Sequence, residues 1–314
     1  MASFDLCMEA KLLERLNHEN IIRLHAVKAG NVEDAVNNRE YFIVLDRLTE
    51  TLQDRMIQWK QSNNKRCLWG GGAFGNRPKR DELGRVRTVA IGIANGMEYL
   101  HAKGIIFRYV LFWFNPQIWG IGNALTIICT LRILLNRLVS DLKPSNIGFD
   151  ESGTVKIFDF GIARELQLVA KSGRLLGFAG TPRYMASEIL GGAKVYTLSA
   201  DVYSFGVLLW EICTCDDAYD DICTMEQYKH QVAQKGLRPP LFHVRDKNLR
   251  ELIAECWHPN PEKRPSMAQV RTRLEDICID VPTEISSDSD LLAPSYGIHK
   301  PSESDPTWRV SEGF

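Results

Sequence analysis

One short stretch, from Asn146 to Asp159, constrains the fold of this chain more than any other. Two apolar runs, 147–149 and 155–158, flank a polar turn sequence, Asp-Glu-Ser-Gly, at residues 150–153. This pattern predicts a β-hairpin. The residue before the first strand of a hairpin and the residue after the second lie at neighbouring ends. We therefore expect Asn146 and Asp159, whose side-chain oxygens suit Mg²⁺, to lie close enough to share a metal ion.

The residues just before the hairpin add further chemistry. Asp141 and Lys143 precede Asn146 in the sequence Asp-Leu-Lys-Pro-Ser-Asn, and Asp159 begins an Asp-Phe-Gly triplet. A carboxylate at Asp141 can accept the proton of an attacking hydroxyl, and Lys143 can neutralise charge on a transferred phosphate. Either motif alone is usually an ordinary turn or a solvated loop. The two motifs in order, on either side of one hairpin, indicate phosphoryl transfer.

Three later segments extend the pattern. Residues 180–188 read Gly-Thr-Pro-Arg-Tyr-Met-Ala-Ser-Glu, residues 198–211 form a long, largely apolar run, and Cys256-Trp257 is followed at 260–266 by Asn-Pro-Glu-Lys-Arg-Pro-Ser. Together with the two motifs above, these segments closely resemble the eukaryotic protein kinase family. The resemblance implies an α+β protein-kinase-like fold. Its helical C-lobe would be nearly complete, and its N-lobe partial, with the regulatory helix and two strands.

For the catalytic centre, the resemblance implies one role for each matching residue. Asp141 would be the catalytic base, with Lys143 beside it, and Arg108 would position a phosphorylated activation loop. Asn146 and Asp159 would be the metal ligands, so the expected cofactors are ATP and Mg²⁺.

The resemblance also assigns residues on the substrate side of the domain. Ser172 is the nearest candidate for phosphorylation in the activation loop, and Thr181 is implied to be a docking residue. Glu188 and Arg264 are implied to form a structural ion pair. Asp201 is implied to hold the catalytic loop by hydrogen bonds to its backbone. Ordinary surface charge is the alternative interpretation of these last three residues.

The first part of the chain fits the same family. Residues 4–16 have apolar side chains at helical spacing and match the regulatory helix, in which Glu9 would pair with the ATP-anchoring lysine. Leu45 matches the gatekeeper at the end of a strand. The backbone from Asp46 to Leu48 would then face the adenine base.

Two elements of the family's ATP site are missing before Glu9. Only eight residues precede Glu9, none of them lysine, so there is neither a glycine-rich loop nor a lysine strand. The G-x-G-x-x-G match at 70–75 lies after the adenine-facing segment Asp46 to Leu48, which is the expected hinge. It is in a polar stretch that no lysine strand follows, and a flexible loop insertion explains it better. Either the true N-terminus lies upstream of Met1, or the chain lacks half of the family's ATP-binding site.

A second departure interrupts the catalytic loop. The arginine and aspartate that the family has side by side are Arg108 and Asp141 here, with residues 109–140 between them. The segment is foreign in composition, because 109–131 carries no charge and contains two tryptophans. It could be a membrane span, a genuine insertion or a translated intron. A span would place Arg108 and Asp141 on opposite faces of the membrane. An intron is compatible with the codons that could encode the residues at the two ends of the segment.

Bulk composition favours an ordinary enzyme domain. Lys+Arg 38 against Asp+Glu 39 gives a net charge of −1, which suggests neither nucleic acid nor an anionic membrane as a partner. The eight cysteines form no C-x-x-C pair and the seven histidines are scattered, so zinc is not expected. No signal sequence is evident at the N-terminus, and we expect a cytoplasmic protein with reduced thiols. The oligomeric state stays open.

The chain divides into a kinase-like domain, 1–279, and an acidic tail, 280–314, that we expect to be disordered. Helices are predicted at 4–16, 50–61, 83–102, 198–214, 224–234, 248–257 and 267–278. Strands are predicted near 21–27, 40–46, 147–149 and 155–158, and a loop at 62–82.

Lys143 and Thr181 are typical of serine/threonine kinases, and Cys256-Trp257 resembles their tyrosine-kinase-like branch. The sequence therefore predicts a serine/threonine kinase acting on protein substrates, with impaired activity in this form of the chain. A non-catalytic kinase-like interaction module is the alternative. A single-pass membrane protein, spanning at 109–131, is a weaker one.

Overall fold

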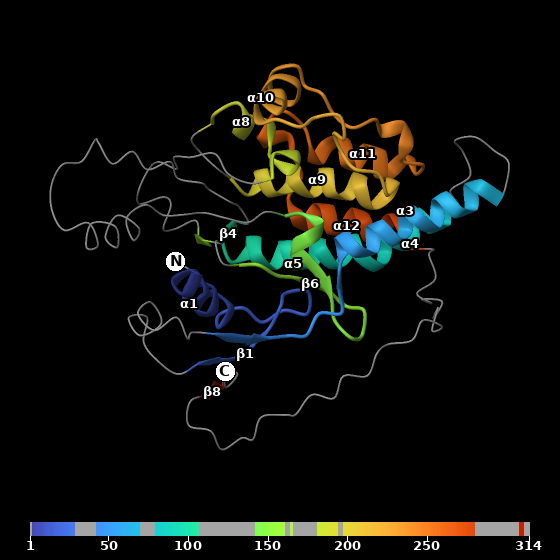
Figure 1. Cartoon of the computed structure of the whole chain (residues 1–314). Helices are drawn as coiled ribbons and strands as arrows, with labels where there is room; N and C mark the ends of the chain where they lie inside the picture. Colours follow the sequence, from blue (N-terminus) through green and yellow to red (C-terminus); the bar gives the residue numbers. More distant parts are fainter. Residues whose placement is uncertain are drawn as a thin grey trace, which may run out of the picture.

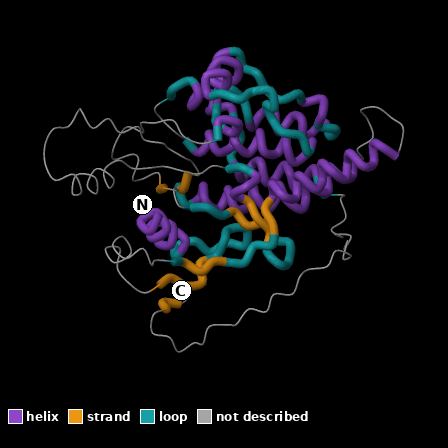
Figure 2. Tube along the Cα trace, in the orientation of Figure 1, coloured by secondary structure: helices purple, strands orange, loops and turns teal. Residues whose placement is uncertain are grey.

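The structure is a computed structural model of the chain and describes residues 2–28, 42–69, 79–106, 142–160, 164–165, 181–193, 197–279 and 308–310. These residues form a small part, with one helix and a sheet, and a larger part that is mainly helical (Figure 1). Figure 2 shows most helices in the upper part of the view, whereas strands lie in the lower part, in the centre and at the left. This is the α+β arrangement that the sequence predicts.

The small part contains helix α1 (Ala2–Leu13) and an antiparallel sheet in the order β2-β1-β8. Strand β1 (Leu24–Lys28) pairs with β2 (Ile43–Leu45) on one edge and with β8 (Trp308–Val310) on the other. We predicted no structure in the acidic tail, and β8 is a correction within it. Alternating apolar residues favour a strand there, and the edge of β1 offers backbone groups to pair with.

The larger part consists of helices that surround one long central helix. Its elements are α3 (Leu52–Trp69), α4 (Lys79–Arg85), the π-helical η1 (Val86–Ala90), α5 (Ile91–Ala102), α8 (Ser187–Leu190), α9 (Leu198–Thr214), α10 (Met225–Tyr228), the π-helical η5 (Lys229–Gln234), α11 (Lys247–Cys256) and α12 (Met267–Ile277). Short 3₁₀ turns are η3 (Pro144–Asn146), η4 (Pro182–Tyr184), η6 (Leu241–His243) and η7 (Pro261–Lys263). Short strands β3 (Glu50–Thr51), β4 (Ile105–Ile106) and β7 (Arg164–Glu165) complete the described elements.

Helix α9 is the centre of the core. From Ala200 to Thr214 every residue except Ser204 is buried, so the helix is covered on all sides, as its nearly continuous apolar sequence predicts. Gly206 allows α11 to approach closely. A Cβ added at Gly206 would lie 2.7 Å from Cβ of Cys256, which is too close for any real side chain.

Helix α5 supports the hairpin that the sequence singled out. Strands β5 (Ile147–Phe149) and β6 (Val155–Ile157) pair in antiparallel register, as predicted. Gly92 and Gly96 of α5 let β6 pack against the helix backbone. A Cβ at Gly96 would lie 2.8 Å from Cδ1 of Ile157, and one at Gly92 would lie 3.1 Å from Cβ of Val155.

The prediction of a loop at 62–82 is wrong at both ends. Helix α3 continues to Trp69, and α4 begins at Lys79. The sequence after residue 61 contains lysine, arginine and leucine, whose helix propensities outweigh the modest cost of two asparagines. In α4, Asp81 and Glu82 lie in the first turn and Arg85 in the last, an order that favours a helix electrostatically.

In the part of the chain that the structure describes, no helix is both long and apolar enough to cross a membrane. Residues 109–140, with the predicted insertion, intron or membrane span, lie outside the described residues.

Candidate functional site

The β5–β6 hairpin brings Asn146 and Asp159 to the same end. Ile147 lies opposite Ile157, and the Phe158 N–H donates to the Asn146 carbonyl at 3.1 Å. Asn146 is buried, whereas Asp159 is exposed. Asp159 has a left-handed backbone (φ 66°), an uncommon conformation for a residue with a side chain. The predicted hairpin is confirmed, and its register brings these two residues to the same end. That they share a metal ion stays a prediction.

Local chemistry fixes the turn of this hairpin. Oδ1 of Asp150 accepts hydrogen bonds from the N–H groups of Ser152 and Thr154, at 3.0 and 2.9 Å, and from the Ser152 hydroxyl at 2.6 Å. Gly153 takes a positive φ of 80°, which glycine adopts without strain. The turn therefore sets the register of β5 and β6, and with it the position of Asp159.

Glu9 reaches the same region from α1. Its Oε1 accepts a hydrogen bond from the Phe160 N–H at 3.0 Å, and its side chain is buried. Burial raises the pKa of Glu9, the charge of Asp159 raises it further, and the hydrogen bond from Phe160 opposes both. No ion pair to Glu9 is found among the residues that the structure describes. Within the described part of the chain, Glu9 therefore has a backbone N–H as its partner and not the cation that the resemblance assigns to it.

The predicted hinge, Asp46 to Leu48, follows β2 directly. Leu45, the matched gatekeeper, lies opposite Leu24 in the sheet and is partly buried. The Leu48 side chain packs against the hairpin: a Cβ added at Gly148 would lie 2.7 Å from its Cδ1. The hinge is thus in contact with the hairpin that carries Asn146.

The side chain of Asp46 joins the hinge to two strands. Its carboxylate accepts hydrogen bonds from the Arg23 N–H at 2.9 Å and from Nε2 of His25 at 2.8 Å, and Nζ of Lys156 lies 3.5 Å away. Partial burial raises the pKa of Asp46, but the hydrogen bonds and the charge of Lys156 outweigh burial and lower it. Asp46 is therefore an ionised group that follows β2 and contacts side chains of β1 and β6.

Glu188 and Arg264 form the ion pair that the resemblance implies. Arg264 donates from Nη1 to Oε1 of Glu188 at 2.8 Å and from Nη2 to Oε2 at 2.6 Å, a bidentate geometry. It also donates to the carbonyls of His258 and Ser199. Its side chain has no exposed surface. The pair joins η7 to α8 and to the start of α9.

Asp201 is buried at the start of α9, and its Oδ2 lies 2.9 Å from Nε2 of His101. The expected hydrogen bonds from Asp201 to the backbone of the catalytic loop stay a prediction, because Arg108 and Asp141 lie outside the described residues. Lys143 is described and half-buried, just before η3. Thr181 caps η4 in extended conformation, and its carbonyl accepts from the Tyr184 N–H at 3.0 Å.

The partners of the 181–184 segment were not predicted from the sequence. The Tyr184 hydroxyl donates to Oε2 of Glu211 at 2.7 Å, and the Ala218 N–H donates to Oε1 at 2.9 Å. Burial raises the pKa of Glu211 to about 7, although these hydrogen bonds and Arg183 oppose the shift. A glutamate inside the apolar run of α9 is the sequence signal that could have indicated this site, because a buried carboxylate requires partners.

Three predicted site residues, Asp141, Arg108 and Ser172, lie outside the described residues. The structure therefore brings together Asn146, Asp159 and Glu9, but does not place the proposed base.

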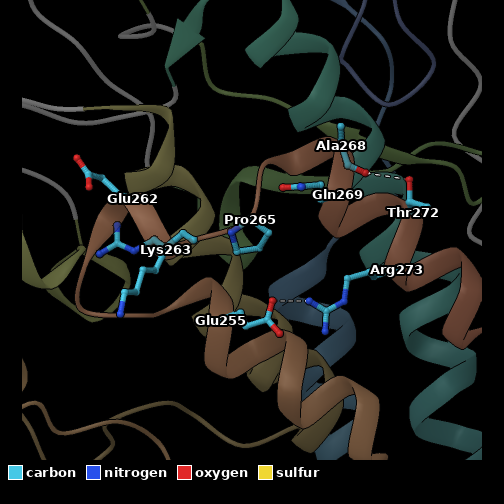
Figure 3. Close-up of a pocket in the computed structure, with 9 residues that line it drawn as sticks. Glu255, Glu262, Lys263, Pro265, Ala268, Gln269, Thr272 and Arg273 are labelled. Carbon is cyan, nitrogen blue, oxygen red and sulfur yellow. Dashed lines mark hydrogen bonds and ion pairs between the residues drawn. The ribbon is translucent and has the colours of Figure 1, made fainter.

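A separate hollow of about 660 Å³ lies in the helical part, between α11, η7 and α12 (Figure 3). It is lined by charged and polar side chains, including Glu255 and Arg273, which form an ion pair. Of the predicted site residues that the structure describes, only Arg264 borders it, and Arg264 is held by Glu188. Asn146 and Asp159 do not line this hollow.

Comparison with known proteins agrees with this geometry. The family described as protein kinase domain matches residues 121–273, a range that begins within the 109–140 segment and includes both acidic motifs. Over this range the chain is similar to the eukaryotic protein kinase family. In kinase terms, the small part is an incomplete N-lobe and the helical part a C-lobe.

Curated kinases resemble the chain over about half of its length or more. The dual specificity protein kinase shkA of Dictyostelium discoideum is 39% identical over 145 residues, 45% of this chain and 27% of that protein. The serine/threonine-protein kinase STY17 of Arabidopsis thaliana is 32% identical over 193 residues, 62% of this chain and 27% of that protein. A probable serine/threonine-protein kinase of Dictyostelium discoideum is 33% identical over 193 residues, 62% of this chain and 11% of that protein. The chain thus spans less than a third of these relatives.

Proposed function

We propose that this chain carries the phosphotransfer core of a serine/threonine protein kinase, which moves the γ-phosphate of ATP to hydroxyl groups of protein substrates. The observation that carries the proposal is the β5–β6 hairpin. It brings Asn146 and Asp159 to one end, directly after the segment that contains Lys143. The match of residues 121–273 to the protein kinase domain supports the same reaction.

In this proposal each residue has one chemical task. Asn146 and Asp159 would hold Mg²⁺, and their oxygen atoms are the donors that this ion prefers. The metal, when bound, would neutralise charge on the phosphates. Asp141 would accept the hydroxyl proton, and Lys143 would neutralise the transferred phosphate. The backbone of Asp46 to Leu48 would face adenine.

The serine/threonine specificity rests on Lys143 and Thr181, and on the names of two of the relatives above; the third is named as dual specificity. A cytoplasmic setting is part of the proposal and rests on the cysteine pattern of the sequence.

We further propose that residues 1–314 as they stand transfer phosphate poorly. Glu9 accepts a backbone N–H where the family has a lysine, and 109–140 separate Arg108 from Asp141. Preorganised charges of this kind contribute on the order of a hundredfold or more each to rate. The same observation on Glu9 favours the second candidate function, a kinase-like module that binds partners without catalysis.

A radiolabelled-ATP assay on three versions tests both ideas. The unmodified chain should show little transfer. A version without 109–140, and with a glycine-rich loop and lysine strand added before Glu9, should be active. Asp159→Ala in that version should abolish the activity. Strong, Asp159-dependent transfer by the unmodified chain would refute the impairment, and no transfer by the completed version would favour the binding module.

A further inference from the structure

One edge of strand β1 is covered by the far end of the chain. Strand β8 pairs with β1 in antiparallel register, and Val27 of β1 lies opposite Arg309 of β8. Figure 1 shows β8 and the C-terminus beside β1. Residues 280–307 separate β8 from Ile279, where the description of the helical part ends. A strand of three residues therefore closes an edge whose N–H and carbonyl groups would otherwise be open to another chain.

The direction of the backbone groups of β1 shows which of them face β8. The Lys28 N–H donates to the Phe42 carbonyl at 3.1 Å, on the side of β2. The N–H groups of successive residues in a strand point to opposite edges, so the Val27 N–H points to β8. Because Val27 and Arg309 are opposite each other, they are in the position of a pair that exchanges two backbone hydrogen bonds. Pairing at this edge therefore requires the N–H of Arg309.

Separate contacts anchor the residues that lead into β1. The Ile22 N–H donates to the Ile157 carbonyl at 3.0 Å, and the Ile157 N–H donates to the Asn20 carbonyl at 2.9 Å. These bonds join the start of the segment to β6. Further along, β1 pairs with β2 on one edge, and within the described part of the chain its other edge is paired by β8 alone. A two-stranded sheet is marginally stable, so this edge favours an added strand.

We propose that this edge of β1 binds an extended peptide of a partner protein as an added strand, and that residues 308–310 are its competitor in cis. Backbone hydrogen bonds supply the affinity in strand addition of this kind, and alternate side chains supply the specificity. Trp308 and Val310 are two residues apart and so share a face of β8. The partner peptide accordingly carries apolar residues at alternate positions. This inference does not depend on the proposed phosphotransfer.

The tether between β8 and the helical part sets the concentration at which a free peptide competes. A tethered segment is held near its site at an effective concentration of about a millimolar or less. A free peptide at about 5 mM exceeds this value, so it can occupy the edge when the tail is impaired. A partner that binds the wild-type chain has to displace the tail, and its apparent affinity is lower for that reason.

The edge is tested on the full chain by NMR, through hydrogen exchange of single amides. Arg309→Pro removes the N–H that faces β1, whereas Arg309→Ala keeps it and is the matched control. The Val27 amide should exchange at least about tenfold faster in Arg309→Pro than in wild type or Arg309→Ala. A peptide with the sequence of residues 306–314, at about 5 mM, should restore slow exchange in Arg309→Pro. The same peptide with proline in place of its arginine should not.

The amide of Leu252, in the buried face of α11, should exchange at one rate in all three proteins, which separates opening of the edge from unfolding of the chain. Equal exchange of the Val27 amide in wild type and Arg309→Pro would overturn the role of the tail. Fast exchange that the peptide does not slow would overturn the binding edge. Protection in wild type that disappears on dilution would mean that a second copy supplies the strand, and would overturn the assignment in cis.

Discussion

At the residue scale, the buried carboxylate of Glu211 predicts how stability depends on pH. Burial raises its pKa from 4.5 to about 7. Between these two values the folded chain holds a proton that the unfolded chain has lost, so stability falls as the pH rises. The total loss attributable to this group is roughly 3 kcal/mol, complete above pH 7 and absent below pH 4.5.

The variant Glu211→Gln cannot ionise and should lack this part of the pH dependence. Urea unfolding of both proteins at pH 5 and pH 7.5 measures the difference. The free energy of unfolding of wild type should drop more than that of Glu211→Gln between the two pH values. Parallel changes in the two proteins would show that Glu211 titrates normally.

Arg264 gives a second prediction at this scale. Its side chain has no exposed surface and donates to both oxygens of Glu188. Arg264→Ala leaves a carboxylate without its cation in a largely buried site, which should cost about 3–5 kcal/mol in chemical denaturation. The control is Arg47→Ala, because Arg47 pairs with Glu151 on the surface, where such pairs contribute about 1 kcal/mol or less. Similar losses in the two variants would contradict the structural role of Arg264.

At the element scale, sequence pattern predicted most of the described helices and strands. The hairpin was predictable because its turn chemistry is local: Asp150 and Gly153 fix the turn by themselves. Helix α9 was predictable because a long apolar run of that length is typical of a buried helix. The end of α3 was not, because the residues after 61 are polar and carry no helical stripe. Strand β8 pairs with β1, far away in sequence, and local pattern does not reveal such pairing.

Substitution by alanine should have opposite effects on stability at two glycines, one in α5 where it packs against the hairpin and one in α4. Gly96→Ala places a Cβ 2.8 Å from Ile157 and 3.1 Å from the Asn20 carbonyl, so we expect a loss of about 1–3 kcal/mol. Gly84→Ala in α4 meets nothing within 4 Å and should stabilise by up to about 1 kcal/mol through helix propensity. Thermal or urea unfolding measures both. A neutral Gly96→Ala would mean that α5 and β6 are further apart than described.

At the scale of the whole molecule, the candidate site draws on distant parts of the chain. The hairpin supplies Asn146 and Asp159, α1 supplies Glu9, and the hinge follows β2. Sequence motifs identified these residues one by one, and the hairpin register explains why two of them are neighbours. The hydrogen bond from Phe160 to Glu9 was not predictable, because it joins residues 151 positions apart. The Glu211 site was missed for the same reason, since its partners lie on separate elements.

We propose that Asn146 and Asp159 form one metal site that acts on ATP. The most direct test is binding of Mn²⁺, in place of Mg²⁺, to the full chain with and without ATP, followed by the electron paramagnetic resonance signal of free Mn²⁺. We expect ATP-dependent binding that Asn146→Ala and Asp159→Ala each weaken at least about tenfold. Asp220→Ala, an exposed aspartate outside the site, should bind as wild type does. Mn²⁺ binding that is the same in wild type and Asp159→Ala, or that does not depend on ATP, would contradict the account.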